Sequence, residues 1–123
     1  MDFKFGEKEE QLRREVCKFA KDELPPDWLS ANCLEEENRD EDWEFGLSIS
    51  KKLAKKGWLT MSWPVEYCGK GASLWEQFVY CEEAAYWGIP GVTMGVSGVD
   101  WVGPSIMLFG SEELKKEHLP LIA

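Results

Sequence analysis

The sequence predicts an all-α domain of five helices. Apolar residues recur at helical spacing in several segments, and residues that typically start or stop helices bound these segments. No segment is a convincing candidate for a β-strand. The chain has 123 residues, of which 44% are hydrophobic and 13% aromatic, so one domain with a packed core is expected rather than a disordered chain.

The first helix is predicted over roughly residues 7–23. Its apolar residues share one face and its charged residues take the other. Gly6 suits the N-cap, acidic residues in the first turn suit the positive end of the helix dipole, and Pro25 and Pro26 end the helix. The apolar face holds Leu12, Val16, Phe19 and Ala20.

The acidic segment of residues 30–41 has little periodicity and is expected to be an exposed loop. A second helix follows it, and Gly57 is expected directly after the end of that helix. Lysines near this end suit the negative end of the dipole. The predicted apolar face holds Trp43, Leu47, Ser50, Leu53 and Ala54.

Residues 58–72 cannot sustain a helix because one proline and two glycines interrupt them. Ser73 and Glu76 then have the spacing of a capping box, in which each side chain binds the backbone N–H of the other residue. The third helix is therefore predicted to begin here and to continue to Gly88, which suits a left-handed cap.

Residues 89–109 contain a single charge, Asp100, and are expected to be buried almost all round. A membrane span is the alternative, since about 20 apolar residues cross a bilayer. Two prolines, four glycines and the central Asp100 argue against it, so a glycine-rich helix packed inside the domain is predicted. The last helix is predicted to begin after Ser111 and to end near Leu119 and Pro120.

Charge and cysteine content exclude several classes of function. The net charge of −9 opposes binding to nucleic acid or to an anionic membrane surface. The four cysteines form no Cys-x-x-Cys pair and only one histidine accompanies them, so the ligand spacing of a metal site is missing. The first ten residues lack the apolar run of a secretory signal, which predicts a reducing cytoplasm and free thiols.

Few residues are candidates for acid–base chemistry. Glu82 and Glu83 are adjacent on the third predicted helix and are not expected to point the same way, so they do not form an acid–base couple. Asp100 is expected to be exposed or paired with a basic residue, with a catalytic acid as the less favoured alternative, and His118 is expected to lie on the surface of the last helix or to cap it. Three glycines without the other features of a phosphate loop are expected to allow close approach of a neighbour or a ligand. These are Gly91, Gly95 and Gly98.

Four segments carry a resemblance to a known family. They are residues 63–73 (WPVEYCGKGAS), 82–86 (EEAAY), 103–104 (GP) and 109–113 (FGSEE). In this order they resemble the N-terminal helical domain of the acyl-CoA dehydrogenases, and the likeness runs collinearly along essentially the whole chain. Because the family pattern begins at the second residue, no room is left for an organelle transit peptide, which favours a bacterial or archaeal cytoplasm.

The resemblance implies a five-helix orthogonal or up-down bundle that belongs to a larger FAD-dependent enzyme. Such an enzyme oxidises the α,β carbon bond of an acyl-CoA thioester. A glutamate on a C-terminal helical domain removes the α-proton, a hydride leaves the β-carbon for the flavin, and an electron-transfer flavoprotein accepts the electrons. The flavin lies mainly between a middle β-domain and the C-terminal domain, so no catalytic, cofactor-binding or metal-binding residue is expected in this chain. A homo-oligomer is also expected.

The resemblance places the wall of the acyl pocket on the glycine-rich segment. Thr93, Met94, Ser97 and Trp101 are the candidate residues, and their spacing puts them on one face if the segment is helical throughout. Methionine suits a flexible apolar tail, and tryptophan is bulky enough to limit its length. The alternative is that Met94 and Trp101 are ordinary core residues.

Cys68 departs from the family pattern, in which Tyr67 is commonly followed by two glycines. If this position needs a positive φ, cysteine costs about 1 to 2 kcal/mol that glycine does not.

A competing hypothesis is a free-standing helical domain that binds a partner protein or its own copy through an apolar face, without catalysis. A reading frame that continues past Ala123 into a β-rich domain would distinguish the two.

Overall fold

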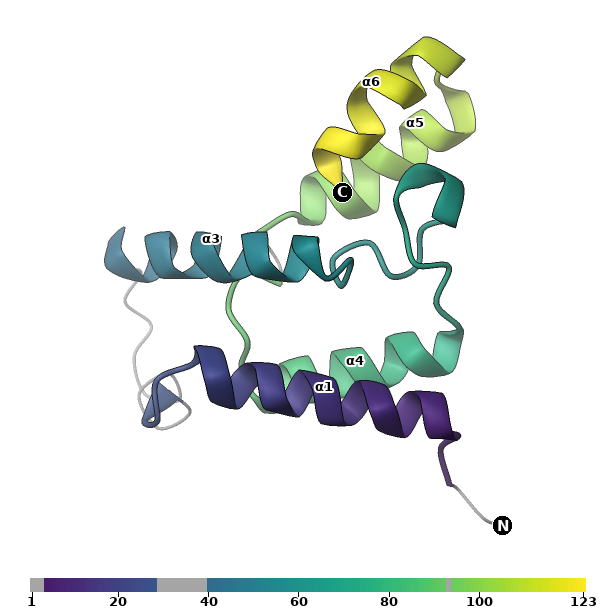
Figure 1. Ribbon diagram of the computed structural model, residues 1–123. Helices are drawn as coiled ribbons and strands as arrows, with labels where there is room; N and C mark the ends of the chain where they lie inside the picture. The colour runs from purple at the N-terminus through teal and green to yellow at the C-terminus, as the bar shows by residue number, and fades with distance from the viewer. Residues whose placement is uncertain (1–3, 29–39, 93) are drawn as a thin grey trace. The chain divides into compact units, whose positions relative to one another are not determined.

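The computed structural model describes residues 4–28, 40–92 and 94–123 and is all helical, as predicted (Figure 1). These residues contain five α-helices and no strand. They form two compact units, which are considered separately. The first unit combines Met1–Arg39 with Ser73–Ile89, and the second combines Asp40–Ala72 with Pro90–Ala123.

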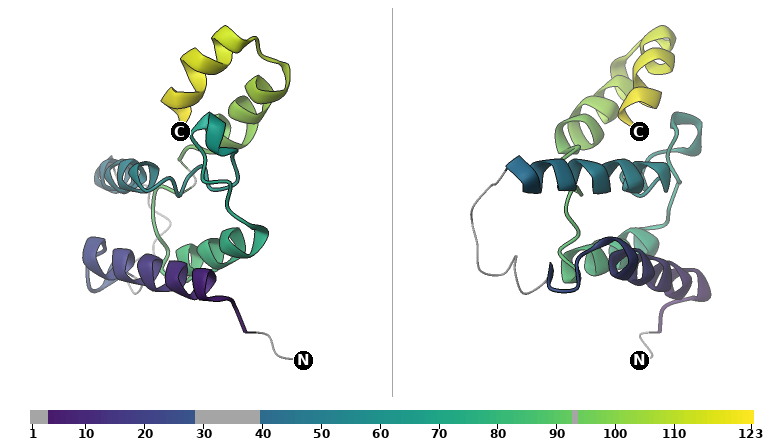
Figure 2. Two further views of the ribbon diagram at one scale, coloured as in Figure 1. Left: turned by 45° about the vertical axis from the view of Figure 1, so that its right-hand side comes forward. Right: turned by 60° about the vertical axis from the view of Figure 1, so that its left-hand side comes forward.

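The first unit is a pair of helices, α1 (Glu7–Glu23) and α4 (Leu74–Tyr86), which lie side by side (Figures 1 and 2). The bounds of α1 and its Gly6 N-cap confirm the prediction. Each helix buries one stripe of apolar side chains, as amphipathic periodicity requires. The stripes hold Leu12, Val16, Phe19 and Ala20 on α1 and Val79, Tyr80 and Ala84 on α4.

Both ends of α4 follow the sequence signals. The Ser73 hydroxyl accepts a hydrogen bond from the Glu76 N–H at 3.2 Å, and the Glu76 carboxylate accepts one from the Ser73 N–H at 2.8 Å. This confirms the predicted capping box. At the other end Gly88 has φ +56°, and the Ile89 N–H donates to the Ala84 carbonyl, as in a left-handed helix cap.

In the second unit, α3 (Asp40–Lys55) ends in the predicted way, because Gly57 has φ +68° and the Trp58 N–H donates to the Leu53 carbonyl. Its buried face differs in part from the prediction. Ile49, Ser50 and Leu53 are buried, whereas Trp43 is 62% exposed and Leu47 is also exposed. At about 100° per residue, Trp43 and Leu47 are turned about 100° and 140° away from the centre of the stripe formed by Ile49 and Leu53.

The rest of the second unit consists of a non-helical segment followed by three short helical elements. The non-helical segment, residues 58–72, contains only a 3₁₀ turn, η1 (Val65–Tyr67), as expected from its proline and glycines. The π-helical segment η2 (Ser97–Val102) leads directly into α5 (Gly103–Phe109). The last helix, α6 (Glu112–Ile122), begins at the predicted Ser111 cap and runs two residues past Pro120.

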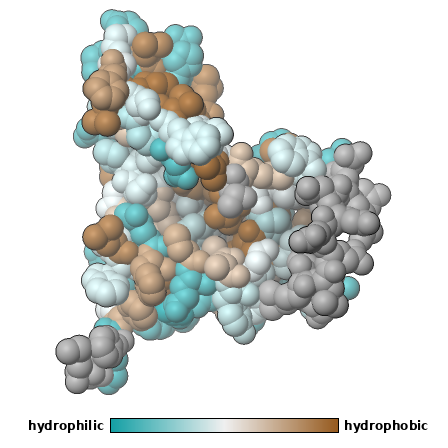
Figure 3. All heavy atoms as spheres, turned by 180° about the vertical axis from the view of Figure 1, so that it is seen from behind, coloured by the Kyte–Doolittle hydropathy of each residue, from teal (hydrophilic) through white to brown (hydrophobic). Residues whose placement is uncertain are grey.

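The prediction that residues 89–109 are buried almost all round is wrong. Residues 90–92 and 94–95 form turns, and the helix that follows has two faces. Its inner face packs against α6 and against Trp63 of the non-helical segment, while several large apolar side chains are exposed. These are Trp101, Val102, Leu108 and Phe109, the last of them 87% exposed. Figure 3 shows apolar surface on the part of the molecule that holds α5 and α6.

No helix in the described ranges is both long and apolar enough to cross a bilayer.

Candidate functional site

Trp63 is the centre of the second unit's core. It is 3% exposed and packs with Val99 and Leu119, and Ile106 and Met107 of α5 lie against this cluster. Two glycines make room for it. A Cβ on Gly69 would collide with the Trp63 carbonyl, and a Cβ on Gly103 would collide with the six-membered part of the indole ring. The Trp63 indole N–H donates to the Val99 carbonyl at 3.1 Å, so this side chain ties the non-helical segment to η2.

The candidate acyl-pocket residues fall around the start of η2. Thr93 lies outside the described residues. Met94 is half-buried in the turn before the helix, where its methyl group lies close to Gly46 of α3. Ser97 is the first residue of η2 and is exposed, and Trp101 is 65% exposed on the same element.

The predicted helical face is therefore wrong in part. Because the helical run does not extend back to Met94, only Ser97 and Trp101 share a continuous helical element. Turn-forming Gly91 explains the late start. It has φ +80° and approaches α3 so closely that a Cβ would collide with the Gly46 carbonyl. The expectation that glycine in this segment permits close approach is thus confirmed at Gly91.

Sequence reasoning missed the hydrogen bond of Trp63 and the π-helical register of η2. Both depend on contacts between segments far apart in the sequence, which periodicity does not report. One signal was available, because Pro104, two residues after the end of η2, removes a backbone donor.

A charged cluster links α1 and α4 in the first unit. Arg13 donates to Glu82 at 2.6 Å and to Glu83 at 2.5 Å, and the Trp87 indole N–H donates to Glu83 at 3.2 Å. The expectation that the two carboxylates do not point the same way is wrong, because long side chains let both reach one guanidinium fork.

The hydrogen bond to Glu82 is the largest cause that raises the pKa of Arg13, and the bond to Glu83 adds to it. Arg13 therefore stays charged, and both carboxylates are occupied in an ion pair that joins two helices. The cluster stabilises the first unit and offers no free acid–base couple.

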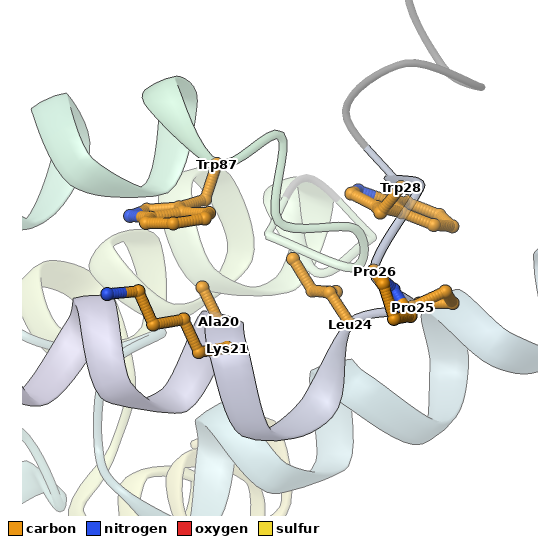
Figure 4. Close-up of a pocket in the computed structure, with 7 residues that line it drawn as sticks. All are labelled: Ala20, Lys21, Leu24, Pro25, Pro26, Trp28 and Trp87. Atoms are coloured by element: carbon orange, nitrogen blue, oxygen red, sulfur yellow. The ribbon is translucent and has the colours of Figure 1, made fainter.

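The first unit also has an aromatic cleft of about 210 Å³ beside the end of α1 (Figure 4). The Lys21 side chain extends beneath the Trp87 ring, with its ammonium 5.8 Å from the ring centroid. The Trp28 indole N–H donates to the Gly88 carbonyl at 2.8 Å. Prolines and aliphatic side chains complete the lining, so the cleft is apolar and contains one cation but no acid–base pair.

Cys68 adopts a left-handed conformation, with φ +66°. The position therefore does have the positive φ that was the condition for a cost of cysteine relative to glycine. The residue is exposed and borders an open groove of about 440 Å³ between η1 and α6. In this groove Lys115 donates to Glu112 at 2.9 Å, a bond that raises the pKa of Lys115, and its ammonium lies 5.8 Å from the Tyr67 ring centroid.

The remaining candidates play no part in these clusters. Asp100 is exposed, as one of the predicted options required, and His118 is partly exposed on α6. The described residues contain no group of three or more histidines, cysteines or carboxylates suited to a metal ion.

We assign no residue of this chain to FAD. The groove of the second unit is lined by Lys115, which Glu112 pairs, and by Lys116, and the cleft of the first unit is lined by Lys21. These lysines alone do not define the site of a pyrophosphate, which backbone N–H groups and several converging cations bind.

These features define an all-helical domain with an exposed apolar helix. The family model for the acyl-CoA dehydrogenase N-terminal domain matches residues 6–123. The chain belongs to the acyl-CoA dehydrogenase family, of which it represents this N-terminal domain.

Relatives of known name agree with this assignment. The chain is 29% identical to acyl-CoA dehydrogenase FadE26 of Mycobacterium tuberculosis, over 100% of this chain and 30% of that protein. It is also 29% identical to acyl-CoA dehydrogenase IpdE1 of Mycolicibacterium smegmatis, over 92% of this chain and 29% of that protein.

Solved structures give the same result. The ChsE4-ChsE5 complex from Mycobacterium tuberculosis has a TM-score of 0.72 at 29% identity, covering 99% of this chain and 29% of that chain. The Tcur3481-Tcur3483 steroid ACAD has a TM-score of 0.68 at 31% identity, covering 99% of this chain and 30% of that chain. The chain therefore spans about three tenths of the length of the relatives that it matches.

Proposed function

We propose that this chain is part of an FAD-dependent enzyme that oxidises the α,β carbon bond of an acyl-CoA thioester, and that this domain lines the acyl pocket. The match to the N-terminal family model over residues 6–123 carries the proposal. The flavin-binding β-domain and the C-terminal catalytic helical domain would lie in the part of the relatives that this chain does not span. In the intact enzyme the bound flavin supplies the hydride acceptor.

The pocket wall is proposed to consist of Thr93, Met94, Ser97 and Trp101. Exposure supports this choice, because an indole that is 65% exposed leaves a large apolar surface for an acyl group to cover. The Ser97 hydroxyl is exposed on the same element, and Met94 offers a flexible apolar side chain beside it. These groups bind and orient the acyl chain and exclude water from it.

The acyl group is proposed to be bulky. The Tcur3481-Tcur3483 steroid ACAD, solved also as a variant, has the same fold and is 31% identical to this chain. Acyl-CoA thioesters that carry polycyclic groups are therefore the first substrates to test, beside straight chains. An electron-transfer flavoprotein is the proposed electron acceptor, and the cytoplasm is the proposed location. The proposed assembly is an oligomer, and the solved ChsE4-ChsE5 complex supports a multichain state.

Trp101→Ala tests the pocket assignment in the intact enzyme. Removing the indole should lengthen the cavity, and each additional buried methylene contributes about 0.8 kcal/mol. We measure kcat/KM over a series of acyl-CoA lengths and expect the length with the highest kcat/KM to increase by a few carbons. Trp43→Ala is the matched control, because it removes an indole of similar exposure (62%) from α3 of the same unit. An unchanged profile in a folded Trp101→Ala enzyme would remove Trp101 from the pocket.

The reaction itself has a direct spectroscopic test. Anaerobic addition of an acyl-CoA to the intact enzyme should bleach the visible absorbance of the oxidised flavin. The 123-residue chain alone should purify colourless. A stoichiometric yellow complex on titration with FAD would contradict the proposal that other domains of the enzyme bind the flavin.

A second candidate function has one observation in its favour. Leu108 and Phe109 of α5 are highly exposed, as expected of a surface that another protein covers. A free-standing interaction or dimerisation domain would then show self-association or dye binding and would have no flavin-dependent activity. Sedimentation at several concentrations, together with the flavin assay, separates the two functions.

A further inference from the structure

The π-helical register of η2 leaves one carbonyl without a backbone donor. The Gly103 N–H donates to the Gly98 carbonyl, five residues back, instead of the Val99 carbonyl, which it would serve in an α-helix. In the π register the next donor, for Val99, would be residue 104. That residue is Pro104, which has no N–H. The Val99 carbonyl must therefore find its hydrogen bond outside the helix.

The Trp63 side chain provides that bond. Its indole N–H donates to the Val99 carbonyl at 3.1 Å, and both residues are buried, with exposed fractions of 3% and 8%. A buried carbonyl that loses its only donor carries a desolvation penalty, so this contact favours the π register over a disordered turn. The same indole ring also lies against Gly103, where a Cβ would collide with it. The Trp63 side chain thus contacts both Val99 and Gly103, the two residues that would be hydrogen-bonded to each other in an α-helix.

We infer that Trp63 is a positioning residue for the acyl pocket, because it holds η2 in the π register and so sets the direction in which Trp101 points. This inference rests on the proposed function of Trp101. A change of register by one residue corresponds to a rotation of about 100° around the helix axis. Such a rotation would turn Trp101 away from its present face relative to α5. The Ser105 hydroxyl of α5 donates to the Trp101 carbonyl at 2.6 Å, a second side-chain hydrogen bond at the junction of η2 and α5.

The hydrogen bond is tested by a double-mutant cycle in the full protein. Trp63→Phe keeps an aromatic ring and removes the N–H, and we expect amide hydrogen exchange in residues 97–103 to rise about five- to tenfold. Pro104→Ala supplies a backbone N–H for the Val99 carbonyl. It should change exchange little by itself but return the exchange of the Trp63→Phe protein most of the way to the parent value.

Trp58→Phe is the matched control, because Trp58 is also a buried tryptophan of the second unit. Pro104→Ala should give no rescue in that background. Equal rescue in both backgrounds, or no rescue in the Trp63→Phe background, would overturn the assignment of the bond to the register of η2.

The positioning role is tested by the acyl-length profile of kcat/KM in the same set of enzymes. Trp63→Phe should change the ratio between long and short substrates about three- to tenfold in the direction of Trp101→Ala, and Pro104→Ala should reverse the change. A loss of stability alone would lower all rates together and would leave the ratio unchanged.

Two outcomes separate this inference from the proposed function. If Trp101→Ala changes the profile and Trp63→Phe does not, the positioning role is wrong and the pocket stands. If neither variant changes the profile, the pocket assignment fails first, and the positioning role fails with it.

Discussion

The two units of this domain are stabilised in different ways. The first unit consists of regular amphipathic helices whose buried stripes and caps repeat simple sequence rules. The second unit contains left-handed residues, a 3₁₀ turn and a π-helical segment, and individual contacts fix each of them. Many similar contacts share the stability of the first unit, whereas single positions control the second. Point substitutions should therefore have uneven effects in the second unit and graded effects in the first.

The largest effect is expected at Gly69 in the second unit. A Cβ at this position would collide with the backbone carbonyl of Trp63, which cannot move without breaking its bond to the Gly71 N–H. Gly69→Ala should lower the free energy of unfolding by about 3 kcal/mol. Gly71→Ala is the control, because its Cβ would meet only the Val65 side chain at 3.4 Å.

Gly71 has φ +56°, so its replacement by alanine should cost about 1 kcal/mol through backbone strain. Denaturant unfolding of both variants measures the difference. Equal losses would show that the contact of Gly69 with Trp63 is not what restricts this position.

In the first unit the largest single effect is expected at Arg13. Arg13→Met removes the shared partner of Glu82 and Glu83, and the side chain of Glu83 is only 12% exposed. Partial exposure of Arg13 and Glu82 reduces the effect, so the expected loss is about 1 to 2 kcal/mol. Arg14→Met, on the exposed face of α1, should change stability by less than about 0.5 kcal/mol. A similar loss in both variants would mean that the ion pair contributes nothing specific.

A smaller loss is expected at the cap of α4. Ser73→Ala removes one half of the capping box and should cost about 1 kcal/mol. Ser48→Ala removes a hydroxyl from an exposed position in α3, where the hydroxyl donates to the Phe45 carbonyl of the preceding turn, and should be close to neutral. Thermal unfolding monitored by circular dichroism compares them. A neutral Ser73→Ala variant would contradict the importance of this cap for the first unit.

The smallest effect should be a gain. Cys68→Gly relieves the left-handed strain of a residue with a Cβ but increases the entropy of the unfolded chain, so a net stabilisation of about 0.5 to 1 kcal/mol is expected. Cys68→Ala keeps the Cβ and should give no such gain. If alanine stabilised the protein as much as glycine, the benefit would come from loss of the thiol and not from the backbone.

The sequence predicted the regular elements well because their signals are local. The apolar spacing from Leu12 to Ala20, the capping box at Ser73 and the glycines after α3 and α4 each act within a few residues. Helix formation depends on such short-range interactions, so both the number of helices and most of their ends could be predicted.

The π-helical segment η2, which holds part of the candidate pocket, was less predictable because the contacts that fix it come from residues distant in sequence. The π register depends on Trp63, which lies 36 residues before Val99, and no periodic pattern reports such a contact. The expected burial of residues 89–109 failed for a related reason. Composition shows that a segment is apolar but not which of its faces meets another part of the protein, as the exposed Trp101 and Phe109 illustrate.

The pairing of α1 with α4 has a consequence for synthesis on the ribosome. Arg13 and Glu83 are 70 residues apart, so at about 5 to 20 residues per second α1 waits roughly 4 to 14 seconds before its partner helix has been translated. During this interval the apolar stripe that includes Val16 and Phe19 has no α4 to cover it. The segment between the two helices is therefore translated while the apolar face of α1 is uncovered. Chaperones that bind short apolar segments would act on this protein at that stage.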